Sequence, residues 1–345
     1  MPPDPAEAPL FVLGSGRSGT TLLHQMLNAH GRIHLTHEAG FYSAAQPFRK
    51  RLPAREWLGR YYGSFPFAWL GLSVEEVENE LPRPLGESAY PDAFRAVMRA
   101  KAKQYGKARF GDKTPYDSRH AGAMLRDFPG ARIIHIVRDP RATVASLARM
   151  PWAPSSLGMV NLFALAQVQA LAPHRSRIHE VRLEDLLADP EAEMRKVLSF
   201  VGEDWDPRVL DHTRHAPDDA PPYPWLAAAK EAARPTAEGY KKALSPAWIR
   251  LIEGTQRRIF ARYGYLPATL PREPSWWEKA AAVAIDIPRS LWAIGRATGT
   301  FLAMLKTPPP SAGEVQKRVL ALNPRGMESY PGWVPPEVPT VRLRG

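Results

Sequence analysis

The chain has 345 residues, enough to bury the core of one large domain or two smaller ones. It contains no cysteine, which excludes disulfides, thiolate metal sites and cysteine nucleophiles and fits a reducing, cytoplasmic location. Its 46 Lys and Arg against 35 Asp and Glu give a formal net charge of +11, which suits an anionic partner such as a nucleotide, an anionic sugar or a membrane surface; no zinc-finger, RNP or basic-zipper pattern points to nucleic acid.

The first strong pattern is a short apolar run that leads into a glycine-rich loop and a helix-compatible segment. Residues 1–8 lack the basic and apolar regions of a signal peptide, and we expect a flexible N-terminus there, then a strand over 10–13 and a helix over 20–29. This is the layout of a phosphate-binding loop, in which backbone amides and a helix N-terminus hold an anion. The residues expected to contact a nucleotide are Gly14, Ser15, Gly16, Arg17, Ser18, Gly19, Thr20 and Thr21.

This loop departs at one position from the pattern G-x-x-x-x-G-K-[ST] of nucleotide triphosphatases. Gly14, Gly19 and Thr21 match the pattern, whereas Thr20 stands where the pattern has lysine. The loop therefore lacks the charge that reaches β- and γ-phosphates, although its amides, its hydroxyls and Arg17 still suit a 5′-phosphate. We expect a phosphate ligand that needs neither this lysine nor magnesium.

The chain continues with helices that alternate with strands. Gly31 is expected to end the first helix, and an aromatic-rich segment over 57–69 either stacks on an acceptor or packs in the core. Capping residues and apolar runs then predict a helix from Ser73, a helix over 92–105, a loop over 111–115, a strand over 132–137, a helix from Asp139 to about 149, a strand over 178–183 and a helix over 189–200 that Gly202 ends. This alternation predicts an α/β fold, an open parallel sheet flanked by helices, with its ligand at the carboxyl ends of the strands.

A second candidate anion site follows the strand over 132–137. Arg138 ends this strand, and Ser146 comes eight residues later on the helix. A guanidinium and a hydroxyl that converge beside a helix N-terminus form a phosphate site. Two phosphate sites on adjacent strand ends predict a nucleotide that is phosphorylated at two positions.

The C-terminal third is less regular. A loop rich in proline and aspartate over 216–224 precedes a helix over 245–263. Charges and a proline make the apolar segment over 275–306 unsuited to spanning a membrane, and we expect an amphipathic helix that contacts a membrane surface, forms a homodimer or packs on its own domain. The chain is thus divided into a main domain over 9–270, a helical extension over 271–307 and an extended, proline-rich tail over 308–345.

Together, the two anion motifs resemble those of the sulfotransferases that use 3′-phosphoadenosine 5′-phosphosulfate (PAPS). Residues 11–23 are similar to the 5′-phosphosulfate loop of this family. Residues 133–146 are similar to its 3′-phosphate motif, including the arginine and the serine. The resemblance implies that Arg138 and Ser146 bind the 3′-phosphate.

Two later segments extend this resemblance, which covers residues 10–266 in the same order. Residues 181–202 resemble the segment that follows the 3′-phosphate motif, with Leu183 where the family often has tyrosine. Residues 237–246 resemble a diverged form of the late glycine–basic element, which implies that Lys241 and Lys242 close over the 3′-phosphate. The implied architecture is the P-loop-type sulfotransferase fold with a C-terminal helical extension.

The resemblance also implies the chemistry. PAPS is the donor, adenosine 3′,5′-bisphosphate (PAP) is the product, and no metal is required. Glu38 stands where many relatives have a catalytic base, with His34 and His37 as alternatives. Lys113 resembles the lysine near the sulfate and, like Arg17, is expected to stabilise the leaving oxygen.

The expected activity is therefore in-line sulfuryl transfer to a hydroxyl or an amine, on a small-molecule, carbohydrate or glycolipid acceptor. Two alternatives remain open at this point. The first is a P-loop nucleoside or sugar kinase, which predicts magnesium and the absent lysine. The second is a non-catalytic nucleotide-binding protein associated with a membrane through residues 275–306.

Overall fold

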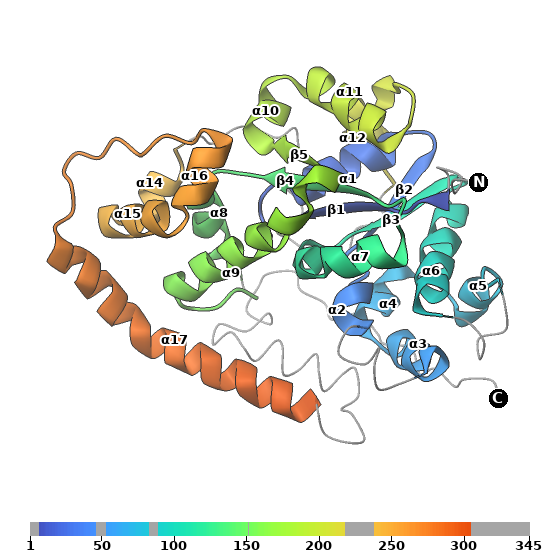
Figure 1. Ribbon diagram of the computed structural model, residues 1–345, viewed down its shortest axis with the longest axis horizontal. Coiled ribbons are helices and arrows are strands. Elements are labelled where there is room, and N and C mark those ends of the chain that lie inside the picture. The colour runs from blue at the N-terminus through green and yellow to red at the C-terminus, as the bar shows by residue number, and fades with distance from the viewer. Residues whose placement is uncertain (1–6, 46–52, 83–88, 151, 218–237, 305–345) are drawn as a thin grey trace.

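The structure is a computed structural model that describes residues 7–45, 53–82, 89–150, 152–217 and 238–304. Its centre is a parallel sheet of five strands in the order β2-β3-β1-β4-β5 (Figure 1). The strands are β1 (Leu10–Gly14), β2 (Ile33–His37), β3 (Arg109–Lys113), β4 (Arg132–Val137) and β5 (Ile178–Arg182). Because all five run in the same direction, their carboxyl ends meet at one edge, where open α/β sheets bind ligands.

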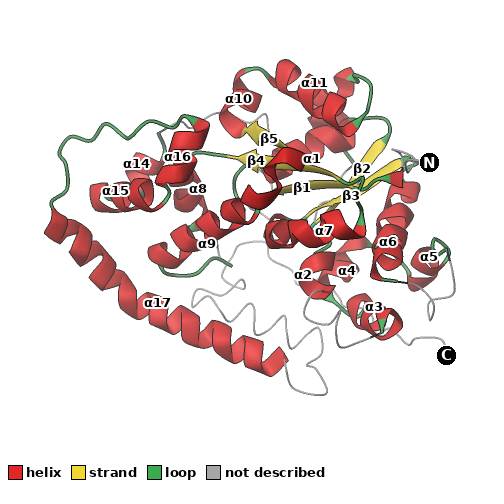
Figure 2. Cartoon of the chain, viewed as in Figure 1, coloured by secondary structure: helices red, strands yellow, loops and turns green. Residues whose placement is uncertain are grey.

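Helices cover both faces of the sheet (Figure 2). In chain order they are α1 (Thr20–Ala29), α2 (Phe41–Ala45), α3 (Ala54–Tyr62), α4 (Phe65–Leu70), α5 (Val74–Glu78), α6 (Tyr90–Gln104), α7 (Ala121–Asp127), α8 (Pro140–Leu147), α9 (Leu157–Ala170), α10 (Leu183–Ala188), α11 (Pro190–Val201), α12 (His212–His215), α14 (Tyr240–Ala243), α15 (Pro246–Thr255), α16 (Arg257–Tyr263) and α17 (Trp276–Met304). Short 3-10 turns lie at Pro115–His120, Ala172–Arg177 and Pro207–Asp211.

Side chains of β1 alternate between two hydrophobic cores, one on each face of the sheet. Phe11 and Leu13 pack with α6 and α7, whereas Leu10 and Val12 pack with α1 and α11. Both sets are buried, as expected for a central parallel strand. The strand therefore fixes the loop that follows Gly14 against a rigid support.

The apolar strands, and the residues that begin and end the helices between them, mostly match the sequence-based expectations. The helix predicted over 20–29 is α1, and the strands predicted over 132–137 and 178–183 are β4 and β5. The capping box at Ser73 opens α5, and Gly202 ends α11 in the left-handed conformation. The fold class, an open parallel sheet flanked by helices, is thus confirmed.

The prediction of a loop over 111–115 is wrong, because Arg109–Lys113 forms β3 in the interior of the sheet. The charged residues Arg109, Asp112 and Lys113 are typical of a surface segment, but in this buried strand each of them has a polar partner inside the protein. Gly111 makes this packing possible, since a Cβ atom there would lie 1.9 Å from the carbonyl oxygen of Leu10 on β1. The neighbouring strand β2 was not anticipated either.

Two helix ends also differ from expectation. The helix predicted over 245–263 is interrupted at Gln256, whose φ of −101° and ψ of 16° depart from helical values, so that α15 and α16 are separate helices. The side-chain Nε2 of Gln256 donates to Asn161 Oδ1 at 2.8 Å. The first helix ends at Ala29 with an extended His30, and Gly31 does not supply a left-handed stop. Its amide donates instead to Asp206 at 2.8 Å.

The aromatic-rich segment over 57–69 packs in the core. Trp57, Tyr61, Tyr62 and Phe67 are almost fully buried in the cluster beside α6. The Tyr61 hydroxyl donates to the carbonyl oxygen of Ala39 at 2.9 Å, in the turn after β2. These rings support the edge of the sheet and are not available to stack on an acceptor. The predicted loop over 216–224 and the tail over 308–345 lie almost wholly outside the described residues.

Candidate functional site

The glycine-rich loop lies between the end of β1 and the start of α1. The Ser18 hydroxyl donates to the carbonyl oxygens of Ser15 and Ile136, at 2.7 and 3.0 Å. The amide of Gly14 donates to Ser118 Oγ at 3.1 Å, and the amide of Gly16 donates to Gln167 Oε1 at 3.0 Å. The loop is therefore anchored to β4, to the turn after β3 and to α9.

The loop ends at the N-terminus of α1, where amides and the helix dipole favour an anion. Gly19 begins this helix with a φ of 102°, and a Cβ atom there would lie 2.7 Å from Leu183 Cδ1. The first turn of α1 carries no acidic residue, so its partial positive charge is not neutralised locally. Thr20 is buried, and Thr21 is half-buried in this first turn.

Arg17 joins the two candidate anion sites. Its Nε donates to Ser146 Oγ on α8 at 3.2 Å, and its carbonyl oxygen accepts from Arg138 Nη1 at 3.2 Å. Arg17 has a left-handed φ of 67°. The loop and the segment after β4 are therefore joined through Arg17. Burial lowers the pKa of Arg138.

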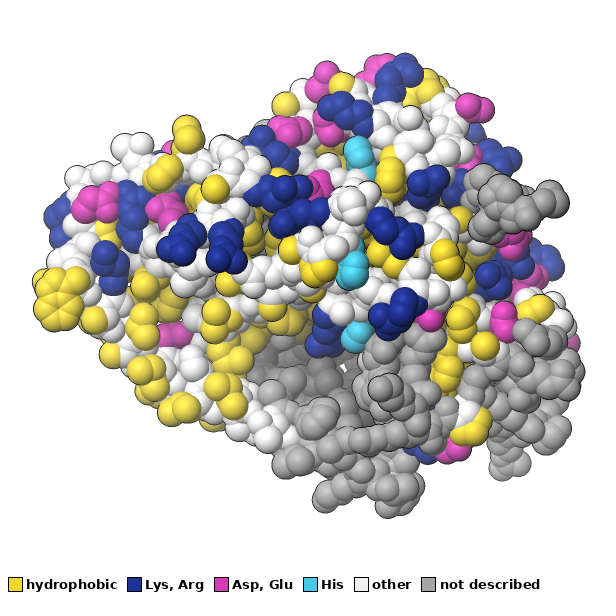
Figure 3. Space-filling view, in the orientation of Figure 1, with side chains coloured by type: hydrophobic (Ala, Val, Ile, Leu, Met, Phe, Trp, Pro, Cys, Tyr) yellow, Lys and Arg dark blue, Asp and Glu magenta, His cyan; other side chains and the backbone are white. Residues whose placement is uncertain are grey.

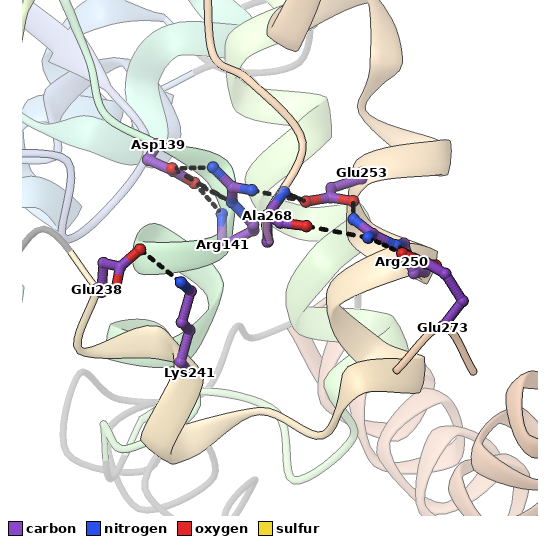
Figure 4. Close-up of polar contacts among 8 residues, drawn as sticks. All are labelled: Asp139, Arg141, Glu238, Lys241, Arg250, Glu253, Ala268 and Glu273. Atoms are coloured by element: carbon purple, nitrogen blue, oxygen red, sulfur yellow. Dashed lines mark hydrogen bonds and ion pairs between the residues drawn. The ribbon is translucent and has the colours of Figure 1, made fainter. Parts of the chain in front are cut away.

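A network of ion pairs holds the turn that carries Arg138 (Figure 4). Asp139 caps α8 by accepting from the amide of Arg141 at 2.8 Å, and it also accepts from the Arg141 guanidinium at 2.7 Å. Glu253 on α15 binds the other side of Arg141 at 2.6 Å, and it pairs with Arg250, which in turn pairs with Glu273. This network fixes α8 against α15. It therefore also holds the backbone at Arg138, which lies between the end of β4 and the start of α8.

The second group of candidate residues lies at the ends of β2 and β3, where His37 and Lys113 are neighbours in the sheet. The ammonium of Lys113 donates to Glu38 Oε1 at 2.9 Å and contacts His37 Nε2 at 3.0 Å. The Lys113 side chain is fully buried, whereas 25% of the Glu38 side chain is exposed. The carboxylate is thus the outward end of this cluster.

The two histidines considered as bases lie deeper. Burial, and then the charge of Lys113, lower the pKa of His37 well below its usual value, so its neutral ring accepts from Lys113. His34 is fully buried and stacks on Tyr105, with ring centroids 4.4 Å apart. Of the three candidates, Glu38 is the one with an exposed acid–base group.

Two buried carboxylates hold the turn after Glu38. Asp112 accepts from the amide of Ala39 at 3.1 Å, and Asp117 accepts from the amides of Tyr42 and Ser43 at 3.2 and 2.8 Å. Glu38 itself has a left-handed φ of 58°. Burial, and then the nearby Asp112, raise the pKa of Asp117 to about 7.

We expect a pH dependence of stability from Asp117. Because its pKa is raised in the fold from the usual 3.8, the folded state binds more protons than the unfolded chain between these values, and stability falls as pH rises through this window. Asp117→Asn retains an acceptor oxygen without the titration. Between about pH 5 and about pH 8 the wild type is expected to lose ~2–3 kcal/mol more unfolding free energy than the variant. Urea unfolding at both pH values checks this, and parallel pH curves would contradict it.

Lys241 and Lys242 are not brought into hydrogen-bonding contact with the loop within the described residues. Lys241 pairs with Glu238 (Figure 4). Lys242 is exposed. Their helix α14 packs on α8 through Tyr240, whose ring centroid lies 4.7 Å from the Arg141 guanidinium carbon. The lysines therefore lie on a helix that packs against α8, and the Lys241 ammonium is engaged by Glu238.

The sequence did not indicate Gln167 or Ser118 as part of this site. Gln167 is 6% exposed and has its Oε1 on Gly16, while its Nε2 is buried without a hydrogen-bond partner among the described residues. A buried amide nitrogen without a partner is unusual, and this one lies beside the glycine-rich loop. The available signal was weak, because Gln167 is one of three amide side chains, with Asn161 and Gln169, in the mainly apolar helix α9. Within the described residues, no three His, Asp or Glu side chains are arranged to hold a metal ion.

Comparison with known proteins agrees with this geometry. The model of the family described as "Sulfotransferase family" matches residues 9–207, more than half of the chain. A Caenorhabditis elegans protein named Protein-tyrosine sulfotransferase A is 25% identical over 59% of this chain and 52% of its own length. A Mycobacterium bovis protein named Omega-hydroxy-beta-dihydromenaquinone-9 sulfotransferase Stf3 is 26% identical over 57% of this chain and 63% of its own length.

Among solved structures, a sulfotransferase domain from a Synechococcus olefin synthase superposes with a TM-score of 0.54 at 21% identity, covering 76% of this chain and 96% of that domain. This likeness shows the fold. The chain spans less than two thirds of the length of each curated relative named above.

Proposed function

Since this chain belongs to the sulfotransferase family, we propose that it transfers a sulfuryl group from PAPS to a hydroxyl or amine acceptor. The bond from sulfur to the 5′-phosphate oxygen breaks as the bond to the acceptor forms, PAP leaves, and the acceptor proton passes to Glu38. The observation that carries this proposal is Arg17, which contacts both Arg138 and Ser146. These contacts place the two candidate anion sites side by side, as a nucleotide with phosphates at two positions requires.

The residues present suit the donor. The N-terminus of α1, with the hydroxyls of Thr20 and Thr21 in its first turn and Arg17 before it, suits the 5′-phosphosulfate. Arg138 and Ser146 suit the 3′-phosphate, because a guanidinium and a hydroxyl recognise a phosphate by charge-assisted hydrogen bonds. The buried Nε2 of Gln167 offers one further donor beside Gly16. Lys241 and Lys242 are proposed to approach the 3′-phosphate only after a movement of α14.

The transfer itself depends on charge. Sulfuryl transfer places negative charge on the oxygen that leaves with PAP, and cationic donors fixed beside that oxygen stabilise the transition state. Lys113, held under the half-buried Glu38, and Arg17, held against Ser146, are the cations proposed for this role. Glu38 accepts the acceptor proton, and no metal is required by this arrangement.

The acceptor is proposed as a class. The names of the two curated relatives refer to protein tyrosine and to a hydroxylated menaquinone derivative, both of which present a hydroxyl. We therefore favour transfer to a hydroxyl, on a small-molecule, carbohydrate, lipid or glycolipid acceptor. A screen of these classes with labelled PAPS would identify which one the chain uses.

Titration calorimetry tests the donor. We expect PAP to bind without magnesium, and binding of magnesium–ATP with no binding of PAP would support the kinase instead. Removal of the 3′-phosphate contacts sharpens the test.

Arg138→Ala or Ser146→Ala is expected to weaken PAP binding about 10- to 100-fold, since a hydrogen bond to a charged group contributes about 1.5–3 kcal/mol. Binding of adenosine 5′-monophosphate, which has no 3′-phosphate, is expected to change little. Equal weakening of both nucleotides would contradict the assignment of the 3′-phosphate to these residues. Both residues also contact Arg17, Arg138 at its carbonyl oxygen and Ser146 at its side chain, so the measurement with adenosine 5′-monophosphate also reports any displacement of the loop.

A further inference from the structure

Helix α17 exposes an apolar face. Eleven large hydrophobic side chains are exposed in the described part of the chain, and eight of them lie on α17. Figure 3 shows hydrophobic side chains gathered along this helix at the lower left of the molecule. Among them are Trp276, Trp277, Ile285, Ile287, Leu291 and Trp292. A patch of this kind on one element marks an interaction surface.

The opposite edge of α17 is fixed to the domain by polar contacts. Asp286 is buried, and its carboxylate accepts from the amides of Leu157 and Gly158 at 3.0 and 2.8 Å and from the Ser156 hydroxyl at 2.6 Å. These groups form the N-terminus of α9, whose dipole an anion stabilises. Ser290 adds a contact of 2.8 Å to Ser156. An ordinary surface helix turns its apolar face toward the core and its polar face toward solvent. In α17 a carboxylate faces the domain, and large apolar side chains face outward.

The charges on and around α17 favour one of two possible partners for this face, a second copy of the chain or an anionic surface. Its acidic residues are engaged, Asp286 at α9 and Glu278 in an ion pair of 2.6 Å with Arg272. Arg289 is exposed. The whole chain carries a formal charge of +11, so a second copy would be repelled and an anionic surface attracted.

We propose that α17 seats this protein on the surface of a lipid bilayer that contains anionic headgroups. Indole rings favour the boundary between headgroups and acyl chains, where the ring is apolar and its N–H stays hydrated. Because α9 and α15 contact one side of α17, lipid reaches only the other side, and the helix lies in the plane of the membrane. No helix in the described part of the chain is long and apolar enough to cross a bilayer.

Vesicle flotation of the full chain tests this proposal. With vesicles of equal parts phosphatidylcholine and phosphatidylglycerol, we expect the wild type to float, and to float less with phosphatidylcholine alone. Trp277→Ser combined with Leu291→Ser, two exposed positions on the outward face, is expected to reduce partitioning about ten-fold or more.

The matched control is Leu210→Ser combined with Leu266→Ser, which removes two exposed apolar side chains away from α17. This variant is expected to float like the wild type, and thermal unfolding checks that both double variants are folded. Equal flotation of both variants, or no flotation of the wild type, would overturn the proposal. Light scattering that shows a dimer dissolved by the α17 substitutions, without flotation, would assign the face to a second copy instead.

Discussion

Glu38→Gln is expected to lower kcat about 100- to 10,000-fold, the range that a positioned general base contributes. Glutamine retains the size of the side chain and its contact with Lys113, but it cannot accept a proton. Affinity for PAP, measured by calorimetry, is expected to stay within about two-fold of the wild type, because the carboxylate lies at the ends of β2 and β3 and not in the loop proposed to bind phosphate.

The choice of acceptor separates a base from a merely structural carboxylate. An acidic phenol needs less help to lose its proton than an aliphatic alcohol, so the loss in the Glu38 variant is expected to be smaller with the phenol. The matched control is Glu75→Gln, which alters an exposed carboxylate on α5 and is expected to leave turnover unchanged. Full turnover of the Glu38 variant with alcohols would remove Glu38 as the base.

Lys113→Met is expected to lower kcat about 100- to 1,000-fold, comparable to the removal of one fixed donor from a developing negative charge. The ammonium is fully buried and held at 2.9 Å from Glu38, so methionine fills its volume without its charge. The Michaelis constant for PAPS is expected to change much less than kcat, because the lysine is proposed to act on the transition state.

The double variant distinguishes two roles for this lysine. If Lys113 stabilises the leaving oxygen independently of Glu38, Lys113→Met combined with Glu38→Gln loses more turnover than either single variant. A double variant no worse than Glu38→Gln would make Lys113 a positioning residue for the base. Lys103→Met serves as control, since Lys103 is an exposed lysine that also pairs with a carboxylate, Glu80.

The fold was predictable where an apolar run is bounded by residues that start or end a helix. The continuous β-branched run of β4, followed by Asp139 and Pro140, leaves few alternatives to a buried strand that feeds a helix. β3 was not predictable by the same reasoning, because Arg109, Asp112 and Lys113 read as surface residues. Their partners come from distant parts of the chain: Arg109 pairs with Glu203 and Asp112 accepts from Thr36.

The candidate site also has a part that could be predicted from the sequence and a part that could not. The loop residues and the pair Arg138 and Ser146 were predicted from local spacing, because a phosphate loop is built from consecutive residues. Their binding of a nucleotide stays a prediction. Gln167 was missed because its contact with Gly16 spans 151 positions of the chain. The role of Asp117 in holding the turn after Glu38 likewise depends on burial, which only the folded arrangement of α2 and the turn after β3 creates.

Arg17 and Glu38 are the two non-glycine residues with positive φ in the part of the chain that the structure describes. Each L-residue in this conformation costs roughly 1–2 kcal/mol relative to glycine, so selection for stability alone would replace both. The residues at these two positions are therefore expected to indicate whether a relative has kept its activity. A relative of this fold that has lost its activity is expected to drift to glycine or asparagine at these positions, whereas an active one retains the side chain and tolerates the strain.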